Sequence, residues 1–177
     1  NGFLEDYAHV IDAFITLYTI TGEDKWLNES KKLTDYAISK FFDSKSGMFF
    51  FSDENTELIA RKMEIMDNVI PSSNSVMARN LYYLGKYFHN EDFTLKAKQM
   101  LSNVYDGMET HGSNYSNWAI LLNHEVYSLY EFVCVGEKSS EFVKELGTKN
   151  TPHVLIAHSP SSSDYLPIFN DKNLIES

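Results

Sequence analysis

An internal repeat constrains this chain more than any other feature of its sequence. The tripeptide Gly-Glu-Asp at residues 22–24 returns as Asn-Glu-Asp at residues 90–92, an offset of 68 residues. The same offset pairs further residues of matching character: Phe14 with Tyr82, Leu27 with Leu95, Leu33 with Leu101, and Asp6 with Asn74. Repeats of this kind are typical of stacked helical pairs that bury a shared core. The repeat therefore predicts a mainly α fold in which one helical hairpin is used twice.

Apolar residues recur at three- and four-residue intervals along both copies, which indicates helices. We expect helices at residues 4–21, 24–41, about 72–88, 93–108 and 115–129. The helix at 4–21 is apolar nearly all round, so it should be a buried inner helix. The helix at 24–41 has one apolar stripe and should lie outside it.

A short β-hairpin is expected between the two helical hairpins. Residues 48–51 and 58–63 are apolar and flank a polar tip at 52–57. Two such segments around a polar connection are typical of paired antiparallel strands. In a helical protein with a cavity, this hairpin would overhang the cavity mouth.

The pattern changes near the C-terminus. Predicted strands at 131–136 and 153–157 enclose a short helix at 139–146, which is a β-α-β pattern. We therefore divide the chain into a helical region, 1–130, and a small α/β segment, 131–177, which we expect to be truncated.

Composition and charge exclude several classes of function. The formal charge of -10 argues against a nucleic-acid partner, because phosphate neutralisation needs clustered Lys and Arg. No apolar run reaches membrane-spanning length, and the first residues resemble no targeting signal, so we expect a soluble, cytoplasmic protein without a membrane partner. Cys134 is the only cysteine, and no metal-ligand spacing stands out. We expect neither a metal nor a cofactor.

A polar cluster begins the third predicted helix. Pro71 is followed by Ser72, Ser73 and Asn74, and Asp67 precedes them. Side-chain oxygens at such positions accept hydrogen bonds from the free backbone amides of the first turn. The same free amides and the helix dipole also suit ligand binding. Capping alone explains these residues, and a site at the mouth of a buried helix is the alternative.

Four stretches give the chain a resemblance to a known family. They are Gly2-Phe3-Leu4-Glu5-Asp6-Tyr7-Ala8, the turn Thr21-Gly22-Glu23-Asp24 before Trp26-Leu27, residues 67–81 with Pro-Ser-Ser-Asn-Ser, and the strand ending in Val135-Gly136. Over nearly its whole length the chain resembles thioredoxin-domain-containing proteins related to spermatogenesis-associated protein 20.

The resemblance implies a partial (α/α)6 toroid similar to N-acylglucosamine 2-epimerases. Members of the family carry an N-terminal thioredoxin-like domain before the toroid. This chain has no thioredoxin motif and supplies only part of the toroid's helices, so the resemblance implies a C-terminal fragment that stops before the cysteine-containing end usual in the family. The missing N-terminal part of the same protein is then an expected partner, and so is a sugar or glycan ligand.

Candidate catalytic residues follow from this chemistry. A sugar isomerase or epimerase needs an acid and a base on opposite faces of one carbon, and His9 is the best candidate among six histidines, none of which matches the epimerases' catalytic pair. A glycosidase needs two facing carboxylates, for which Asp6 and Asp67 are candidates and Glu5 a substitute. The candidate binding residues lie at the same helix entrances: Tyr7, Ser72, Ser73 and Asn74. A packing or capping role is the favoured interpretation of His9, and a capping role suits Asp6 as well as a catalytic one.

Three functions remain open on this sequence. The first is a carbohydrate-related enzyme domain with epimerase-like or glycan-processing activity. The second is a non-catalytic helical scaffold, or a client-binding module that works with the missing thioredoxin-like domain. In the third, the fragment has no activity of its own, and its uncovered helix faces lead it to form a homodimer or leave it partly unstable in isolation.

Overall fold

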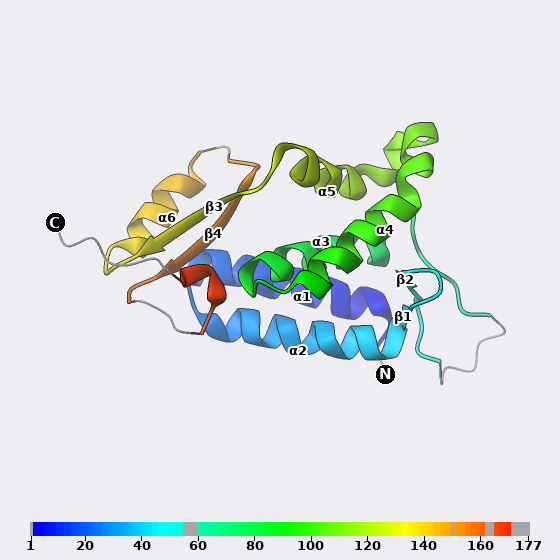
Figure 1. Cartoon of the computed structure of the whole chain (residues 1–177), viewed down its shortest axis with the longest axis horizontal. Coiled ribbons are helices and arrows are strands. Elements are labelled where there is room, and N and C mark those ends of the chain that lie inside the picture. The colour runs from blue at the N-terminus through cyan, green and yellow to red at the C-terminus, as the bar shows by residue number, and fades with distance from the viewer. Residues whose placement is uncertain (1, 55–59, 150, 162–164, 171–177) are drawn as a thin grey trace.

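The computed structural model describes residues 2–54, 60–149, 151–161 and 165–170, and these form a mainly helical structure (Figure 1). The α-helices are α1 (Leu4–Thr21), α2 (Asp24–Phe41), α3 (Ser73–Tyr87), α4 (Glu91–Thr110), α5 (Ser116–Tyr127) and α6 (Ser139–Gly147). The strands are β1 (Phe42–Asp43), β2 (Met48–Phe49), β3 (Tyr130–Val135) and β4 (Val154–Ser159). Each predicted helix is present with ends close to those expected, so the mainly α fold is confirmed.

The repeat corresponds to two helical hairpins, α1–α2 and α3–α4, whose inner helices α1 and α3 pack against each other. The first copy turns at Gly22, which ends α1 in the left-handed conformation at φ 67°. The second copy turns at Asn90, whose side chain accepts a hydrogen bond from the Phe93 backbone N–H at 3.2 Å and so caps α4. Gly22 and Asn90 are thus equivalent in the repeat, but the first ends a helix through its backbone conformation and the second begins a helix through a side-chain cap.

Helix α3 is the centre of the structure. It contacts α1, α4 and α5, and all of its residues are buried except Arg79, Tyr83 and Lys86, which are half-buried. The expectation that α1 is buried all round is wrong, because Val10 is 42% and Ile20 64% exposed. Among the described elements, α1 has one inner helix, α3, beside it, whereas α3 lies between two inner helices, α1 and α5.

The β-hairpin forms one segment earlier than predicted. Strand β2 pairs antiparallel with β1, and the described part of the predicted second strand, residues 60–63, is not a strand. Asp43 directs this pairing, because its carboxylate accepts a hydrogen bond from the Ser46 backbone N–H at 3.1 Å and closes the turn between β1 and β2. Residues 55–59, which include part of the predicted tip, lie outside the described residues.

The β-α-β prediction is confirmed. Strands β3 and β4 pair in parallel, and α6 connects them (Figure 1). Cys134 lies in β3 as expected, half-buried, and burial raises the pKa of its thiol. A raised pKa keeps the thiol protonated at neutral pH, which fits a packing residue.

The β-α-β unit also packs on the helices. Leu155 and Ala157 of β4 belong to the same buried apolar cluster as the helical residues. The Tyr87 hydroxyl on α3 donates a hydrogen bond to the Ile156 carbonyl of β4 at 2.8 Å. Strand β4 therefore packs directly against the inner helices. The division of the chain into 1–130 and 131–177 stays a prediction.

We predict that Gly85→Ala destabilises the protein by about 1–2 kcal/mol, although alanine is the better helix former. A Cβ at Gly85 would meet the Thr94 hydroxyl and lie 3.1 Å from the Thr94 backbone nitrogen and 3.2 Å from the Asn90 carbonyl oxygen. The gain in helix propensity is only roughly 0.5–1 kcal/mol, less than the usual cost of overpacking. Chemical denaturation measures the change.

Gly147→Ala is the matched control, because a Cβ there meets no atom within 4 Å at the end of α6. Equal effects of the two substitutions would show that the close contact between α3 and α4 does not limit stability.

Candidate functional site

Asp67 lies between the first turns of two helices and is 5% exposed. Its Oδ1 accepts hydrogen bonds from the Ser72 backbone N–H at 2.9 Å and the Ser75 hydroxyl at 2.7 Å. Its Oδ2 accepts from the Asn117 backbone N–H at 2.8 Å. The carboxylate therefore joins the start of α3 to the start of α5, where the helix dipoles favour negative charge.

The predicted binding residues of α3 fasten neighbouring segments to this helix. Asn74 is fully buried, and its side chain forms hydrogen bonds to the backbone N–H and carbonyl of Phe49 and to the Glu64 carbonyl, at 2.8, 2.9 and 2.9 Å. Ser72 caps α3 by accepting from the Ser75 N–H at 3.2 Å. Ser73 is buried, and its hydroxyl has no hydrogen-bond partner among the described residues. The side chains of Asn74 and Ser72 thus form hydrogen bonds with other groups of the protein, as expected for structural and capping residues.

The predicted residues of α1 lie near its exposed N-terminus. Asp6 is exposed, and its carboxylate accepts a hydrogen bond from the Phe3 N–H at 2.8 Å. Tyr7 packs on the rings of Tyr36 and Phe41, and burial raises the pKa of its hydroxyl. His9 is half-buried. Among the described residues, no recorded hydrogen bond or ion pair joins Asp6 or His9 to Asp67, and their catalytic roles stay predictions.

A second polar cluster, which the sequence analysis missed, spans the three inner helices. Arg79 on α3 donates from Nη1 to the Asn117 Oδ1 on α5 at 2.8 Å. Its Nη2 forms an ion pair with the Asp12 Oδ1 on α1 at 3.2 Å. The Arg79 side chain is only 15% exposed, so the charge of a mostly buried guanidinium is balanced by one carboxylate and one amide oxygen.

One turn further along α3, Tyr83 contacts His124 of α5. The Tyr83 hydroxyl lies 3.0 Å from the His124 Nε2, whereas the buried Nδ1 has no hydrogen-bond partner among the described residues. His124 is 4% exposed. Burial, followed by the nearby His153 and Arg79, lowers the pKa of its imidazole. Burial also raises the pKa of the Tyr83 hydroxyl. At neutral pH both side chains are therefore uncharged donors or acceptors of hydrogen bonds.

A cavity of about 230 Å³ lies beside this cluster. Helices α1, α3 and α5 provide its polar wall, and β4 with the segment before it provides an apolar one. The polar and aromatic lining residues are Asp12, Thr16, Thr19, Tyr83, Tyr87 and His124. The apolar lining residues are Ile15, Leu129, Pro152, Val154, Leu155 and Ile156. An apolar wall with a few convergent polar groups is the usual composition of a small-ligand site.

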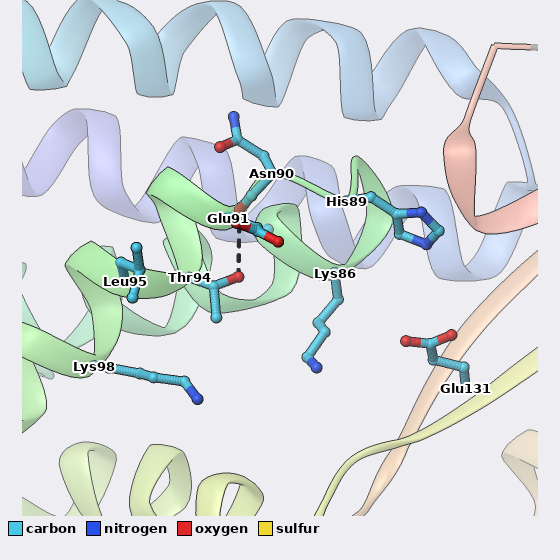
Figure 2. A pocket seen from close by; sticks show the side chains of 9 residues that line it. Lys86, His89, Asn90, Glu91, Thr94, Leu95, Lys98 and Glu131 are labelled. Carbon is cyan, nitrogen blue, oxygen red and sulfur yellow. Dashed lines mark hydrogen bonds between the residues drawn. The ribbon is translucent and has the colours of Figure 1, made fainter.

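A larger, more open cavity of about 350 Å³ lies where α3 turns into α4 (Figure 2). Lys86, Lys98 and Glu131 extend toward it, and the Thr94 hydroxyl is held by the Asn90 carbonyl at 3.3 Å. Its charges are of mixed sign, and its histidine, glutamates and Lys98 are exposed to water. The smaller cavity is the better candidate site, because polar residues of three helices, Asp12, Tyr83 and His124, meet at it.

Among the described residues, no group of three or more His, Cys, Asp or Glu side chains is placed to hold a metal ion. No described helix is both long enough and apolar enough to cross a membrane.

The fold and the site define a class of protein, in which paired helical hairpins present polar inner-helix residues to a small cavity closed by a β-α-β unit. No protein-family model matches the chain. It is similar to spermatogenesis-associated protein 20 of Rattus norvegicus, with 30% identity over 147 residues that cover 82% of this chain and 19% of that protein. The Homo sapiens protein of the same name is 29% identical over the same shares.

A further similarity is to an uncharacterized protein of Caenorhabditis elegans, with 26% identity over 168 residues that cover 93% of this chain and 23% of that protein. The chain thus spans about a fifth of the length of the curated relatives it matches. These similarities support a relationship to the proteins named spermatogenesis-associated protein 20.

We predict that Asp67→Asn lowers the free energy of unfolding by about 2–4 kcal/mol, because hydrogen bonds to a buried charge are worth about 1.5–3 kcal/mol each. Both carboxylate oxygens accept hydrogen bonds, so an amide nitrogen in either position would face a donor. Chemical denaturation measures the loss. Asp106→Asn on the exposed face of α4 is the control, with an expected change within about 0.5 kcal/mol.

Unchanged stability of Asp67→Asn would contradict the capping role. It would return Asp67 to the candidate acids and bases.

Proposed function

We propose that this chain is part of a carbohydrate-related, N-acylglucosamine 2-epimerase-like toroid domain, and that its inner helices bind a small polyol or sugar. Two helical hairpins with adjacent inner helices, followed by the inner helix α5, suit part of a toroid. The observation that carries the proposal is the cavity at which Asp12, Tyr83 and His124 converge from three inner helices.

The chemistry of the cavity suits a hydroxyl-rich ligand. Asp12 offers carboxylate oxygens to ligand hydroxyls, and the imidazole of His124 lines the same cavity. Thr16 and Thr19 donate their own protons to backbone carbonyls at 3.0 and 2.7 Å, which leaves their oxygens as acceptors. The apolar face of a sugar ring can pack on the tyrosine rings and on β4.

Size selects the ligand further. Pockets for drug-sized molecules have volumes of about 300–1,000 Å³. At about 230 Å³ this cavity falls below that range, which favours a monosaccharide over an oligosaccharide. His9 precedes Asp12 by one turn on α1 and is our proposed partner residue for acid-base chemistry. We assign Asp6 and Asp67 to supporting positions, because their oxygens accept backbone hydrogen bonds.

We predict that N-acetylglucosamine or a related amino sugar binds and perturbs the NMR resonances of Thr16, Tyr83 and His124. Asp12→Asn should weaken binding about tenfold or more, because a hydrogen bond to a charged group is worth about 1.5–3 kcal/mol. Isothermal titration measures the affinity, and Asp106→Asn on the outer helix α4 should leave it unchanged.

If none of the amino sugars and monosaccharides tested bound, the proposed carbohydrate-related function would be contradicted. If Asp12→Asn and Asp106→Asn weakened binding equally, the loss would reflect the net charge of the protein and not a specific contact with Asp12.

A scaffold function is the second candidate, and the uncovered face of α5 favours it. Ile120, Val126 and Tyr127 are exposed there, and so is Tyr105 on the neighbouring α4. Helices α1 and α3 each have an outer helix packed on them, whereas no described helix covers this face of α5. Such faces mark contacts with a partner, which here is the missing part of the same protein or a second copy.

We predict that the isolated chain self-associates, and that Val126→Lys weakens the association by placing a charge in the apolar contact. Sedimentation velocity over a range of concentrations measures this. Ser140→Lys, an equally charged change on the exposed surface of α6, is the control. A monomer at every concentration would exclude the homodimer.

A further inference from the structure

We propose that three histidines, His124, His153 and His158, form an acid-sensitive latch that holds the β-α-β unit against the helices at neutral pH and releases it on acidification. All three lie where this unit meets the inner helices: His124 on α5, His153 directly before β4, and His158 within β4. The latch itself does not depend on what the cavity binds. Its consequence for ligand binding rests on the proposed function.

His158 occupies the tightest part of this contact. It is 1% exposed, and its ring lies against the turn between α1 and α2, where a Cβ on Gly22 would come within 2.8 Å of the ring. Neither ring nitrogen has a hydrogen-bond partner among the described residues. A proton added to this imidazole would place a charge in a site without solvent, which is strongly unfavourable.

His124 and His153 form the other end of the latch. Their rings meet edge to face, with centroids 5.5 Å apart. The Nδ1 atoms of both are buried without a hydrogen-bond partner. The His153 Nε2 lies 3.3 Å from the Asn123 Nδ2, and the His124 Nε2 lies 3.0 Å from the Tyr83 hydroxyl. Protonation of His124 would put a charge at a buried position against the ring of His153.

The groups that face these rings do little to offset such charges. Toward His124, α3 presents Arg79, a cation that repels an imidazolium. The Asp12 carboxylate of α1 lines the same cavity but is paired with Arg79. Glu125, next along α5, pairs with Lys98 at 2.7 Å.

The remaining titratable neighbours are mainly tyrosines. The Tyr127 ring lies 6.1 Å from that of His153. Near His158, α1 presents Tyr18, whose pKa is raised by burial and then by Asp24 of α2, so it stays neutral. Among the described residues, the nearby backbone of Thr19 favours a charged His158, although it makes no hydrogen bond of good geometry with the ring.

The direction of the effect follows from linkage. Burial lowers the pKa values of His124 and His158 below the ordinary 6.5. The released state therefore binds more protons, and the docked state loses stability as the pH falls below about 6.5. Because β4 forms one wall of the 230 Å³ cavity, release would also open that cavity. Acidic pH would then abolish ligand binding before the helices unfold.

Amide hydrogen exchange of the whole chain at pH 7.5 and 5.5 tests the latch without any ligand. After correction for the intrinsic exchange rate, protection of β4 should fall about tenfold or more at the lower pH, because the released state binds more protons. Protection of the buried amides of α3 should change much less. NMR titration of the same protein should give His158 and His124 pKa values below the ordinary value of about 6.5.

Substitutions separate the histidines from a general acid effect. His158→Phe keeps a ring but removes the titration, so it should reduce the loss of β4 protection at pH 5.5. His124→Asn combined with His153→Asn gives a second route if His158→Phe does not fold. His111→Gln, at the exposed end of α4, should retain the wild-type response.

Unchanged β4 protection at pH 5.5 would overturn the proposal. So would an equal loss of protection in α3 and β4, or a full pH response in both histidine variants. These outcomes leave the sugar-binding titration at neutral pH unaffected, so failure of the latch and failure of the proposed function are distinguishable.

Discussion

The buried carboxylate of Asp67 fixes the arrangement on which the site depends. A charge at this depth is tolerable only if it is fully hydrogen-bonded, and Asp67 accepts three hydrogen bonds from the starts of α3 and α5. One carboxylate thus ties the starts of α3 and α5 together. Arg79, the seventh residue of α3, makes a second tie, because it donates to Asn117 near the start of α5. The polar cluster lies beside these two ties.

The central position of α3 explains why several of its polar residues are paired with neighbouring helices. Because α1, α4 and α5 surround it, a side chain such as Arg79 or Tyr83 cannot reach bulk water freely and needs a partner on a neighbouring helix. Asp12 and His124 supply those partners. Among the described residues, the Arg79 Nε, the Asn80 Oδ1 and the His124 Nδ1 stay buried without a hydrogen-bond partner, and each such atom costs stability.

The β-α-β unit adds a wall to one face of the helices. Strand β4 contributes apolar residues to the shared core and a wall to the cavity, and Tyr87 ties it to α3. Besides Leu155 and Ala157, the unit meets the helices through the imidazole rings of His153 and His158. Its attachment is therefore more sensitive to proton concentration than the contact between the two helical hairpins, which is mainly apolar. Ligand access and the docking of β4 are coupled through this geometry.

The helices, the repeat and the β-α-β order could be read from the sequence, because each depends on local periodicity and turn chemistry. The sequence also marked Asp67 to Asn74 as a helix start, but their partners, Phe49 and Asn117, lie far along the chain. Only the tertiary structure placed Asp12, Arg79 and His124 together, since each looks like an ordinary polar position on its own helix. It likewise decided that β2 pairs with β1, because the Asp43 carboxylate accepts a hydrogen bond from the Ser46 backbone N–H and closes the nearer turn. Periodicity determines which face of a helix is apolar, whereas the packing of helices determines which polar residues meet.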